Sequence, residues 1–268
     1  MNDHNAMLQD PKHGLRGFLV LDTFVRLLIW TGAMTGSIAV LTALGGWPER
    51  GIVGADWRTA LDWAVAGATL ILLFNTFYVA LLVVLRFPIP QPREGRYSVA
   101  PGKPIDRQLV WSCLIATLTK ARYEAPFPGF LVFHVANLPP LCWLMGPIFG
   151  PRSRSCYVTD PMFIDPHMIE VGRNVVFGLG AIIAGHAQGR EIVIIKKTVI
   201  EDDVIIGGNA IIYDGCRIGR GAVILGGAIV RSDTTIGENE VWGGVPAKKI
   251  KTLPPYGEAG GEGDEVSV

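Results

Sequence analysis

Two long stretches near the start of the chain contain no charged residue. Residues 27–48 and 63–85 are 22 and 23 residues long, and apolar side chains dominate both. About 20 such residues allow a helix to cross the hydrocarbon core of a bilayer. Buried helices of soluble proteins are usually shorter, and a signal peptide would not be followed by a second apolar stretch. We therefore predict that residues 1–86 form an N-terminal segment and a hairpin of two transmembrane helices.

The distribution of basic residues predicts the orientation of this hairpin. The connector 49–62 holds two arginines beside three acidic residues, whereas basic residues cluster before the first stretch and after the second. These flanking residues are Lys12, Arg16, Arg26, Arg86, Arg93, Arg96, Lys103 and Arg107. Because basic residues favour the cytoplasmic side, both ends of the hairpin are expected in the cytoplasm of a bacterial inner-membrane protein.

The pattern changes after the second stretch. Residues 87–107 are polar and rich in proline, which predicts a linker. Residues 108–154 are apolar but contain five prolines between positions 126 and 147, so a continuous membrane-spanning helix is not expected. Their many aromatic residues favour short helices at the membrane interface, with the core of a soluble subdomain as the alternative. The acidic, Gly-rich residues 254–268 predict a disordered tail.

A six-residue period dominates the second half of the chain. Apolar residues occupy every sixth position at Ile194, Ile200, Ile206, Ile212, Ile218, Ile224, Val230, Ile236 and Trp242, and earlier at Val171, Phe177 and Ile183. This period fits neither an α-helix nor a hairpin. It fits a solenoid in which three hexapeptides make one triangular coil of short parallel strands. The fold class is therefore mostly β, with a parallel β-helix over residues 155–253 after an α-helical membrane region.

Composition and charge narrow the function. The chain has 24 basic and 24 acidic residues, so a nucleic-acid partner is not expected. Only 18% of its 268 residues are charged and 49% are hydrophobic, in keeping with a part that lies in lipid. The four cysteines are scattered without a CxxC pair, which is typical of reduced thiols in a protein that faces the cytosol.

The repeat region resembles the hexapeptide-repeat acyltransferases. The likeness rests on KTVIEDDVIIGGNAIIYDGCRIGRGAVI, on Gly185-His186 at the end of a coil, and on the closing GGVPAKKIK. With its apolar stretches, the chain looks most like the membrane-associated hexapeptide domains of poly-lysine-synthetase-like proteins and of polysaccharide acetyltransferases. The resemblance implies a left-handed β-helix and an acyl-CoA-dependent O- or N-acyltransferase without a permanently bound cofactor. Ala-Gly-His-Ala-Gln departs from the Thr-His-Pro of the sugar acetyltransferases.

His186 is the candidate general base. The six-residue period breaks between Ile183 and Ile194, so His186 should project from the solenoid on a loop. An imidazole has a pKa near neutrality and suits removal of a proton from an attacking hydroxyl or amine. The related enzymes place their base at this point. His167 at the first coil is expected to cap it, with a role in the active site as the alternative.

One nitrogen of a neutral imidazole base must be held by an acceptor. Asp165, Glu170, Glu191 and a backbone carbonyl are all possible partners for His186, and the sequence does not choose among them.

The donor, acyl-CoA, is expected to lie along the solenoid, and the acyl group is expected to be acetyl. Backbone edges free of side chains could pair with the amides of pantetheine, and lysines could meet the phosphates of coenzyme A. The candidate residues for acyl-CoA are Gly207, Gly208, Gly226, Gly227, Ala228, Lys248 and Lys249. The alternatives are corner glycines needed only for turning, and a basic surface near anionic lipid.

Other readings remain open from the sequence. A zinc hydratase of the γ-carbonic anhydrase kind would need three histidines, and the repeat region has two, so no metal site is expected. A non-catalytic membrane scaffold is the other alternative. Four coils leave solenoid faces uncovered, which predicts a homotrimer. Because the chain enters from the membrane, the acceptor is expected to be membrane-held, such as a glycolipid, or a polysaccharide-type molecule.

Overall fold

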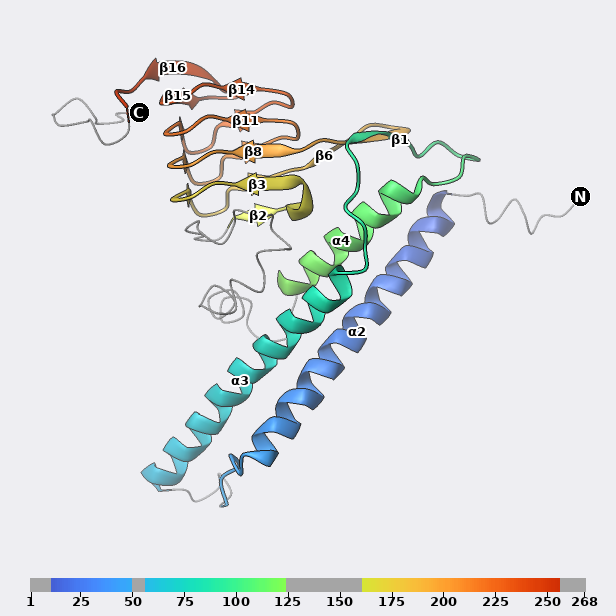
Figure 1. Ribbon diagram of the computed structural model, residues 1–268, viewed down its shortest axis with the longest axis vertical. Coiled ribbons are helices and arrows are strands. Elements are labelled where there is room, and N and C mark those ends of the chain that lie inside the picture. Colours follow the sequence, from blue (N-terminus) through green and yellow to red (C-terminus); the bar gives the residue numbers. More distant parts are fainter. Residues whose placement is uncertain (1–10, 50–55, 124–160, 256–268) are drawn as a thin grey trace, which may run out of the picture. The chain divides into compact units, whose positions relative to one another are not determined.

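A computed structural model describes residues 11–49, 56–123 and 161–255 (Figure 1). These residues divide into two compact units. The helical unit contains residues 12–49, 56–88 and 118–123, and the β unit contains residues 89–117 and 161–255. Each unit is described by itself below.

The helical unit is built on two long helices, α2 (Pro11–Ala43) and α3 (Trp57–Arg86). Asp56 caps the start of α3 by accepting a 2.9 Å hydrogen bond from the amide of Thr59. Gly32 and Gly36 of α2 permit close packing, because a Cβ at either position would lie 3.3 Å from Leu81 or Phe77 of α3. Small residues spaced by four are typical of helices that associate in lipid.

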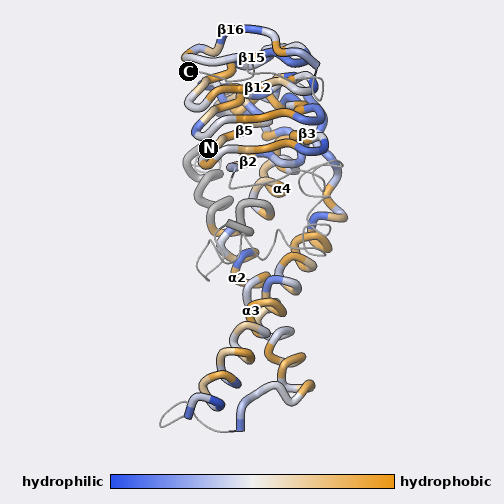
Figure 2. The backbone as a smooth tube through the Cα atoms, turned by 90° about the vertical axis from the view of Figure 1, so that its left-hand side faces the viewer, coloured by the Kyte–Doolittle hydropathy of each residue, from blue (hydrophilic) through white to orange (hydrophobic). Residues whose placement is uncertain are grey.

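Both helices are long and apolar enough to cross a membrane, over Val20–Ala43 and Trp57–Arg86. The prediction of two apolar helices is confirmed, but the first helix ends earlier than expected. It stops at Ala43, and Gly45 follows with a φ of +62°, a conformation that suits glycine. Apolar residues colour much of both helices in Figure 2.

The β unit consists of short strands wound into a parallel β-helix. In chain order its elements are β1 (Gly95–Ser98), α4 (Arg107–Tyr123), β2 (Met162–Phe163), η2 (Pro166–Met168), β3 (Ile169–Val171), β4 (Val176–Phe177), β5 (Ile182–Ile183), β6 (His186–Gln188), β7 (Ile192–Ile195), β8 (Thr198–Ile200), β9 (Ile205–Ile206), β10 (Ile211–Ile212), β11 (Arg217–Ile218), β12 (Val223–Ile224), β13 (Ile229–Val230), β14 (Thr235–Ile236), β15 (Glu240–Gly243) and β16 (Lys248–Thr252). The last six residues of α4 fall in the helical unit.

Three sheets form the sides of the β-helix, and we number them for reference. Sheet 1 contains β2, β5, β10 and β13; sheet 2 contains β3, β8, β11 and β14; sheet 3 contains β4, β9, β12, β15 and β16. All neighbours pair in parallel except β15 and β16. The chain passes from sheet 1 to sheet 2 to sheet 3 and returns to sheet 1, so each coil has three corners.

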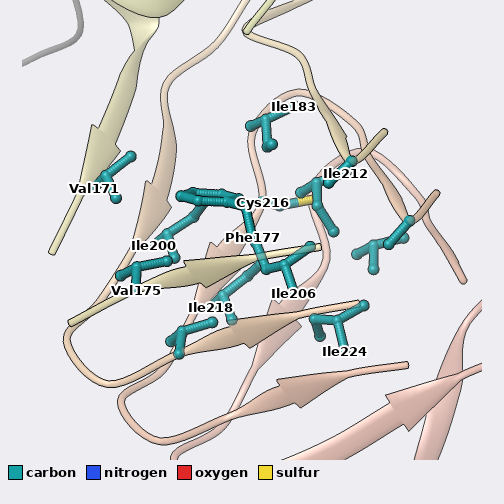
Figure 3. Packing of buried hydrophobic residues seen from close by; sticks show 14 of the residues in the cluster. Val171, Val175, Phe177, Ile183, Ile200, Ile206, Ile212, Cys216, Ile218 and Ile224 are labelled. Atoms are coloured by element: carbon teal, nitrogen blue, oxygen red, sulfur yellow. The ribbon is translucent and has the colours of Figure 1, made fainter. Parts of the chain in front are cut away.

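The apolar residue of each hexapeptide points inward and stacks on its equivalent in the next coil. In sheet 3, for example, Phe177 pairs with Ile206, Ile206 with Ile224, and Ile224 with Trp242. Figure 3 shows Phe177, Ile206 and Ile224 of this column among the buried side chains. The parallel β-helix predicted from the six-residue period is therefore confirmed.

Ile194 is an exception to the predicted stack. It lies in β7, which pairs antiparallel with β6 rather than with a neighbouring coil. The coil resumes at β8, whose Ile200 is the next inward residue. The 11-residue offset before Ile194 reflects this β-hairpin, which is inserted between sheets 1 and 2.

The predicted linker 87–107 carries regular structure, which corrects that part of the domain division. Its residues Gly95–Ser98 form β1, which pairs antiparallel with Ile192–Ile195 of β7. Long-range pairing with the inserted hairpin offsets the low strand propensity of this Pro-rich segment. The hairpin and β1 thus make a separate three-stranded antiparallel sheet.

The predicted helices of residues 108–154 are described only as far as α4. Leu109 of α4 packs with Met168, Val193 and Ile195 of the β unit. These contacts favour the alternative of a soluble subdomain core for the first part of this segment. Residues 124–160 and most of the predicted tail lie outside the described residues.

Candidate active site

The corner between sheets 1 and 2 is where the coils differ most. Its connections are residues 164–168, 184–197, 213–216 and 231–234, one above the other. The second connection is long because it contains the β6–β7 hairpin. Polar side chains gather at this corner, and His186 stands at the base of the hairpin.

His186 is the first residue of β6 and lies opposite Ile195 of β7. It was expected on a projecting loop, and here the prediction is wrong in detail. The hairpin projects, while His186 stays beside the coil because antiparallel pairing fixes the hairpin base. Its side chain is 31% exposed, so the imidazole is sheltered but still open to a substrate.

Asp165 is the acceptor that orients His186. Oδ2 of Asp165 forms a hydrogen bond with Nδ1 of His186, and the Asp165 side chain is only 5% exposed. With Nδ1–H donated to a carboxylate, Nε2 remains the basic nitrogen. Of the other candidates, Glu170 pairs with Lys197, and Glu191 lies next to β7 with its backbone oxygen accepting from Val99.

Two carboxylates set the electrostatics of the imidazole. The hydrogen bond from His186 to Asp165 raises the pKa of His186, burial opposes this, and the charges of Asp165 and Asp214 add to the rise. Asp214 belongs to the same corner one coil further on and accepts a 2.6 Å hydrogen bond from Ser232. Sequence reasoning missed Asp214, although counting one coil from Asp165 and His186 along the repeat leads to the same corner.

His167 is buried in η2 rather than exposed as a second base. It is 7% exposed, and its Nε2 lies 2.9 Å from Oγ of Ser112 in α4. This hydrogen bond joins the β-helix to a residue more than 50 positions earlier, which no local pattern of the sequence could indicate.

The glycines predicted to bind acyl-CoA lie together, but at another corner from His186. Gly207, Gly208, Gly226, Gly227 and Ala228 form two adjacent connections between sheets 3 and 1. Sheet 1 therefore separates them from His186 within one copy of the chain.

Gly207 has a packing role at its corner. A Cβ on Gly207 would collide with the backbone nitrogen of Gly226 and lie 2.7 Å from the carbonyl carbon of Leu225. Tight stacking of coils thus explains this glycine without a ligand. Gly226 is less constrained, since its Cβ would approach only the oxygen of Gly208, at 3.3 Å.

Lys248 and Lys249 lie on β16, which covers the last coil of sheet 3. Nζ of Lys249 donates a 2.6 Å hydrogen bond to Oε1 of Glu240, and this contact does most to lower the pKa of Glu240. Lys249 is therefore partly neutralised by its own chain, whereas Lys248 is exposed.

An open cleft of about 450 Å³ lies beside the hairpin. Its walls come from Glu94, Gly95 and Arg96, from residues 194–197, and from Gly215 and Asp233. Charged groups of both signs line it, including the ion pair of Lys196 with Asp233. The charged groups of this lining could hold polar groups of a bound molecule, beside the apolar Ile194 and Ile195.

Within the described ranges, no group of three or more His, Cys, Asp or Glu side chains is placed to hold a metal ion. The zinc alternative therefore finds no ligand set in that part of the chain.

The β unit is thus a parallel β-helix of six-residue repeats, with a histidine–aspartate pair at the corner that carries the inserted hairpin. Comparison with known proteins finds similar repeats in a family of bacterial transferases. Residues 197–232 match the family model described as bacterial transferase hexapeptide (six repeats). The likeness of the repeat region to the hexapeptide-repeat transferases is thereby confirmed.

Curated relatives are similar to part of the chain. The 2,3,4,5-tetrahydropyridine-2,6-dicarboxylate N-acetyltransferases of Staphylococcus aureus strains JH9 and COL are 45% identical over 80 residues, or 30% of this chain. The match spans only 31% of the length of these relatives.

Solved structures show a more distant likeness. A maltose O-acetyltransferase from Clostridium difficile 630 is 20% identical, with a TM-score of 0.38 over 56% of this chain and 90% of that one. A hexapeptide-repeat acetyltransferase from Vibrio cholerae O1 biovar eltor, complexed with acetyl coenzyme A, is 18% identical with a TM-score of 0.38 over 57% and 94%. At such scores the strand register, and not these likenesses, establishes the fold.

Proposed function

We propose that this protein is an acyltransferase that moves an acyl group, expected to be acetyl, from acyl-CoA to a hydroxyl or amine. The observation that carries the proposal is the Asp165–His186 pair at the extruded corner of a hexapeptide-repeat β-helix. A buried carboxylate that holds Nδ1 leaves Nε2 free to accept a proton.

The chemistry needs only this base and two bound substrates. Nε2 of His186 takes the proton from the acceptor hydroxyl or amine as the acceptor oxygen or nitrogen attacks the thioester carbonyl. A C–O or C–N bond forms, the C–S bond breaks, and the proton passes to the departing thiolate of CoA. Asp165 stabilises the imidazolium formed in between. No acyl-enzyme is required.

The assignment of acyl-CoA as the donor rests on the likeness to the hexapeptide transferases and on backbone N–H groups at the surface of the β-helix. Acyl-CoA acts as a co-substrate, and no cofactor is held between turnovers. Gly208 and Gly226 have amide N–H groups without a hydrogen-bond acceptor among the described residues, so they could pair with pantetheine. Lys248 is an exposed cation that could meet a phosphate.

The helical unit supports a membrane location. In the most apolar windows of its two helices only 22% and 28% of the residues are buried, so they differ from core helices of a soluble protein. We place them as a multi-pass hairpin in a bacterial inner membrane, with the β-helix in the cytoplasm where acyl-CoA is found. A membrane-held acceptor such as a glycolipid, or a polysaccharide-type molecule, would suit the charged cleft.

A homotrimer is supported by the unequal faces of the β-helix. Outward residues of sheet 1 are Met162, Ile182, Ile211 and Ile229, and those of sheet 3 include Val176, Ile205 and Val223. Sheet 2 instead presents Glu170, Val199, Arg217 and Thr235, three of them polar, and Glu170 and Arg217 form ion pairs. Leu179, at the corner between the two apolar faces, is 71% exposed. The apolar face of sheet 1 in one copy can pack against the apolar face of sheet 3 in the next copy. Three copies joined in this way close a ring.

The proposal is tested by replacing His186 in membranes supplied with labelled acetyl-CoA. His186→Ala should lower turnover by about 10²- to 10⁴-fold, the usual contribution of a general base, without weakening acetyl-CoA binding. Gln188→Ala is the matched control, because Gln188 lies on the same strand and is exposed. Full transfer by His186→Ala would contradict the base assignment. Failure of the unaltered protein to bind any acyl-CoA would favour the scaffold alternative.

A further inference from the structure

The segment before the repeat region holds the turn that carries Asp165. Nε2 of Gln91 donates a hydrogen bond to the backbone oxygen of His167 and also lies 3.8 Å from the sulfur of Met168. Ser112 of α4 forms the 2.9 Å hydrogen bond to the His167 ring. Both residues belong to the same compact unit as the β-helix. Two residues of the segment 89–117 are therefore hydrogen-bonded to η2.

The opposite side of this turn is held by the residue before His186. The backbone oxygen of Asp165 accepts a 2.8 Å hydrogen bond from the amide of Met168, which closes the turn. A Cβ on Gly185 would lie 2.5 Å from Cβ of Met168 and 3.1 Å from Cβ of Asp165. Gly185 thus allows η2 to approach the coil closely enough for Asp165 to reach His186.

We infer that Ser112 and His167 are positioning residues that hold Asp165 against His186, so that residues 89–117 belong to the catalytic apparatus. The inference rests on the proposed function, because it assigns the two residues a task in the same acyl transfer. Neither residue touches a reacting atom. Each acts through η2 on the carboxylate that selects the basic nitrogen of His186.

The burial of this pair is what an orienting role requires. Ser112 and His167 are 5% and 7% exposed, and burial of a hydroxyl and an imidazole is unfavourable unless they are hydrogen-bonded, as these two are. The attachment of α4 does not depend on them, because Leu109 supplies apolar contacts to the β unit. Removal of the Ser112 hydroxyl should therefore loosen the angle of η2 without detaching the helix.

The ionisable groups around His186 come from three elements. Asp165 adjoins η2, Asp214 lies on the next coil, and Cys113 of α4 is near enough for the Asp165 charge to add to the burial that raises the pKa of its thiol. The hydrogen bond to Asp165 is the largest cause of the raised pKa of His186. A displaced Asp165 must consequently let that pKa fall toward the ordinary imidazole value.

The experiment measures the pKa of His186 by NMR in full-length protein labelled at its five histidines, with His186→Ala to identify the signal. Ser112→Ala and, independently, Gly185→Ala should both lower that pKa and reduce kcat by about 10- to 100-fold, since small misplacements of catalytic groups have such effects. KM for acetyl-CoA should stay unchanged. Ser112→Thr keeps the hydroxyl and should restore both values. Thr117→Ala removes another buried hydroxyl of α4 and serves as the control.

Two outcomes would overturn the inference. One is an unchanged His186 pKa in folded Ser112→Ala and Gly185→Ala proteins. The other is an equal fall in Thr117→Ala, which would indicate general loosening of α4. The NMR measurement stands apart from catalysis, so full activity of His186→Ala would refute the proposed function while the positional linkage could still be read from the pKa.

Discussion

Replacement of Gly207 by alanine separates two explanations of the glycine corner. If the corner exists to admit pantetheine, Gly207→Ala and Gly226→Ala should leave stability equal and both weaken acyl-CoA binding. If coil stacking requires Gly207, only Gly207→Ala should destabilise the fold. The two positions lie at the same corner on consecutive coils, Gly207 facing Leu225 and Gly226 facing Gly208, which makes them a matched pair.

The size of the effect follows from the contacts. The new Cβ of Gly207→Ala meets backbone atoms of Leu225 and Gly226, which cannot rotate away as a side chain would. Relief requires the coils to separate where Gly207 donates to Ile224 at 2.7 Å and Gly227 donates to Gly208 at 2.8 Å. Overpacking costs about 1–3 kcal/mol and each weakened hydrogen bond about 1 kcal/mol, so we expect a loss of about 2–5 kcal/mol.

Thermal unfolding at fixed protein concentration measures this loss. For a domain between about 100 and 150 residues, about 3–5 °C per kcal/mol applies, so the loss corresponds to a fall in Tm of roughly 6–25 °C. Gly226→Ala should stay within about 1 kcal/mol of the original, because its tight 3.3 Å contact opposes the entropic gain of replacing glycine. Equal Tm values for the two variants would refute the packing explanation.

Four further predictions concern the Asp165–His186 pair, the core of the β-helix and its outer faces. Because the Asp165 hydrogen bond raises the pKa of His186, the acidic limb of kcat/KM should lie above pH of about 6.5, and Asp165→Asn should move it to lower pH while turnover falls. The Asp165–His186 pair contributes fully to the free energy of unfolding below the ordinary imidazole pKa, and this contribution is lost as pH rises through the raised pKa of His186 in the folded protein. Asp165→Asn should remove this pH dependence, as measured by urea titrations at several pH values. Ile212→Ala should lower the free energy of unfolding by about 2–5 kcal/mol, since Ile212 is fully buried in the stack. Leu179→Glu should shift mass-photometry populations from trimer to monomer, and a monomeric original protein would refute the assembly.

The repeat could be predicted because its contacts recur. Each inward residue from Ile200 to Trp242 meets an equivalent residue about 18 positions away, so one local rule fixes every coil. The same rule could have placed the site. Counting coils puts Asp165, His186 and Asp214 at one corner and Gly207 at another.

The parts of the fold and of the site that could not be predicted depend on contacts that do not repeat along the sequence. β1 joins β7 across about 97 positions, from Ser98↔Ile192 to Gly95↔Ile195, and no pattern in a Pro-rich segment indicates that partner. The hydrogen bond of Ser112 to His167 is of the same kind. Four acceptors for His186 were compatible with the sequence because the choice of Asp165 depends on the close approach allowed at Gly185.

The separate corners of His186 and of the predicted donor residues have a consequence for the assembly. If sheet 1 of one copy packs on sheet 3 of the next, Lys248 and Lys249 on sheet 3 come to a neighbour's His186 rather than to that of their own chain. A Lys248→Glu/Lys249→Glu protein and a His186→Ala protein should then each be inactive alone. Mixed trimers should regain about one quarter of full activity, because a site needs an intact histidine from one copy and intact lysines from the next, each present with a chance of about one half. Activity that stays at the level of the separate variants after co-expression would show that base and donor residues must come from the same chain.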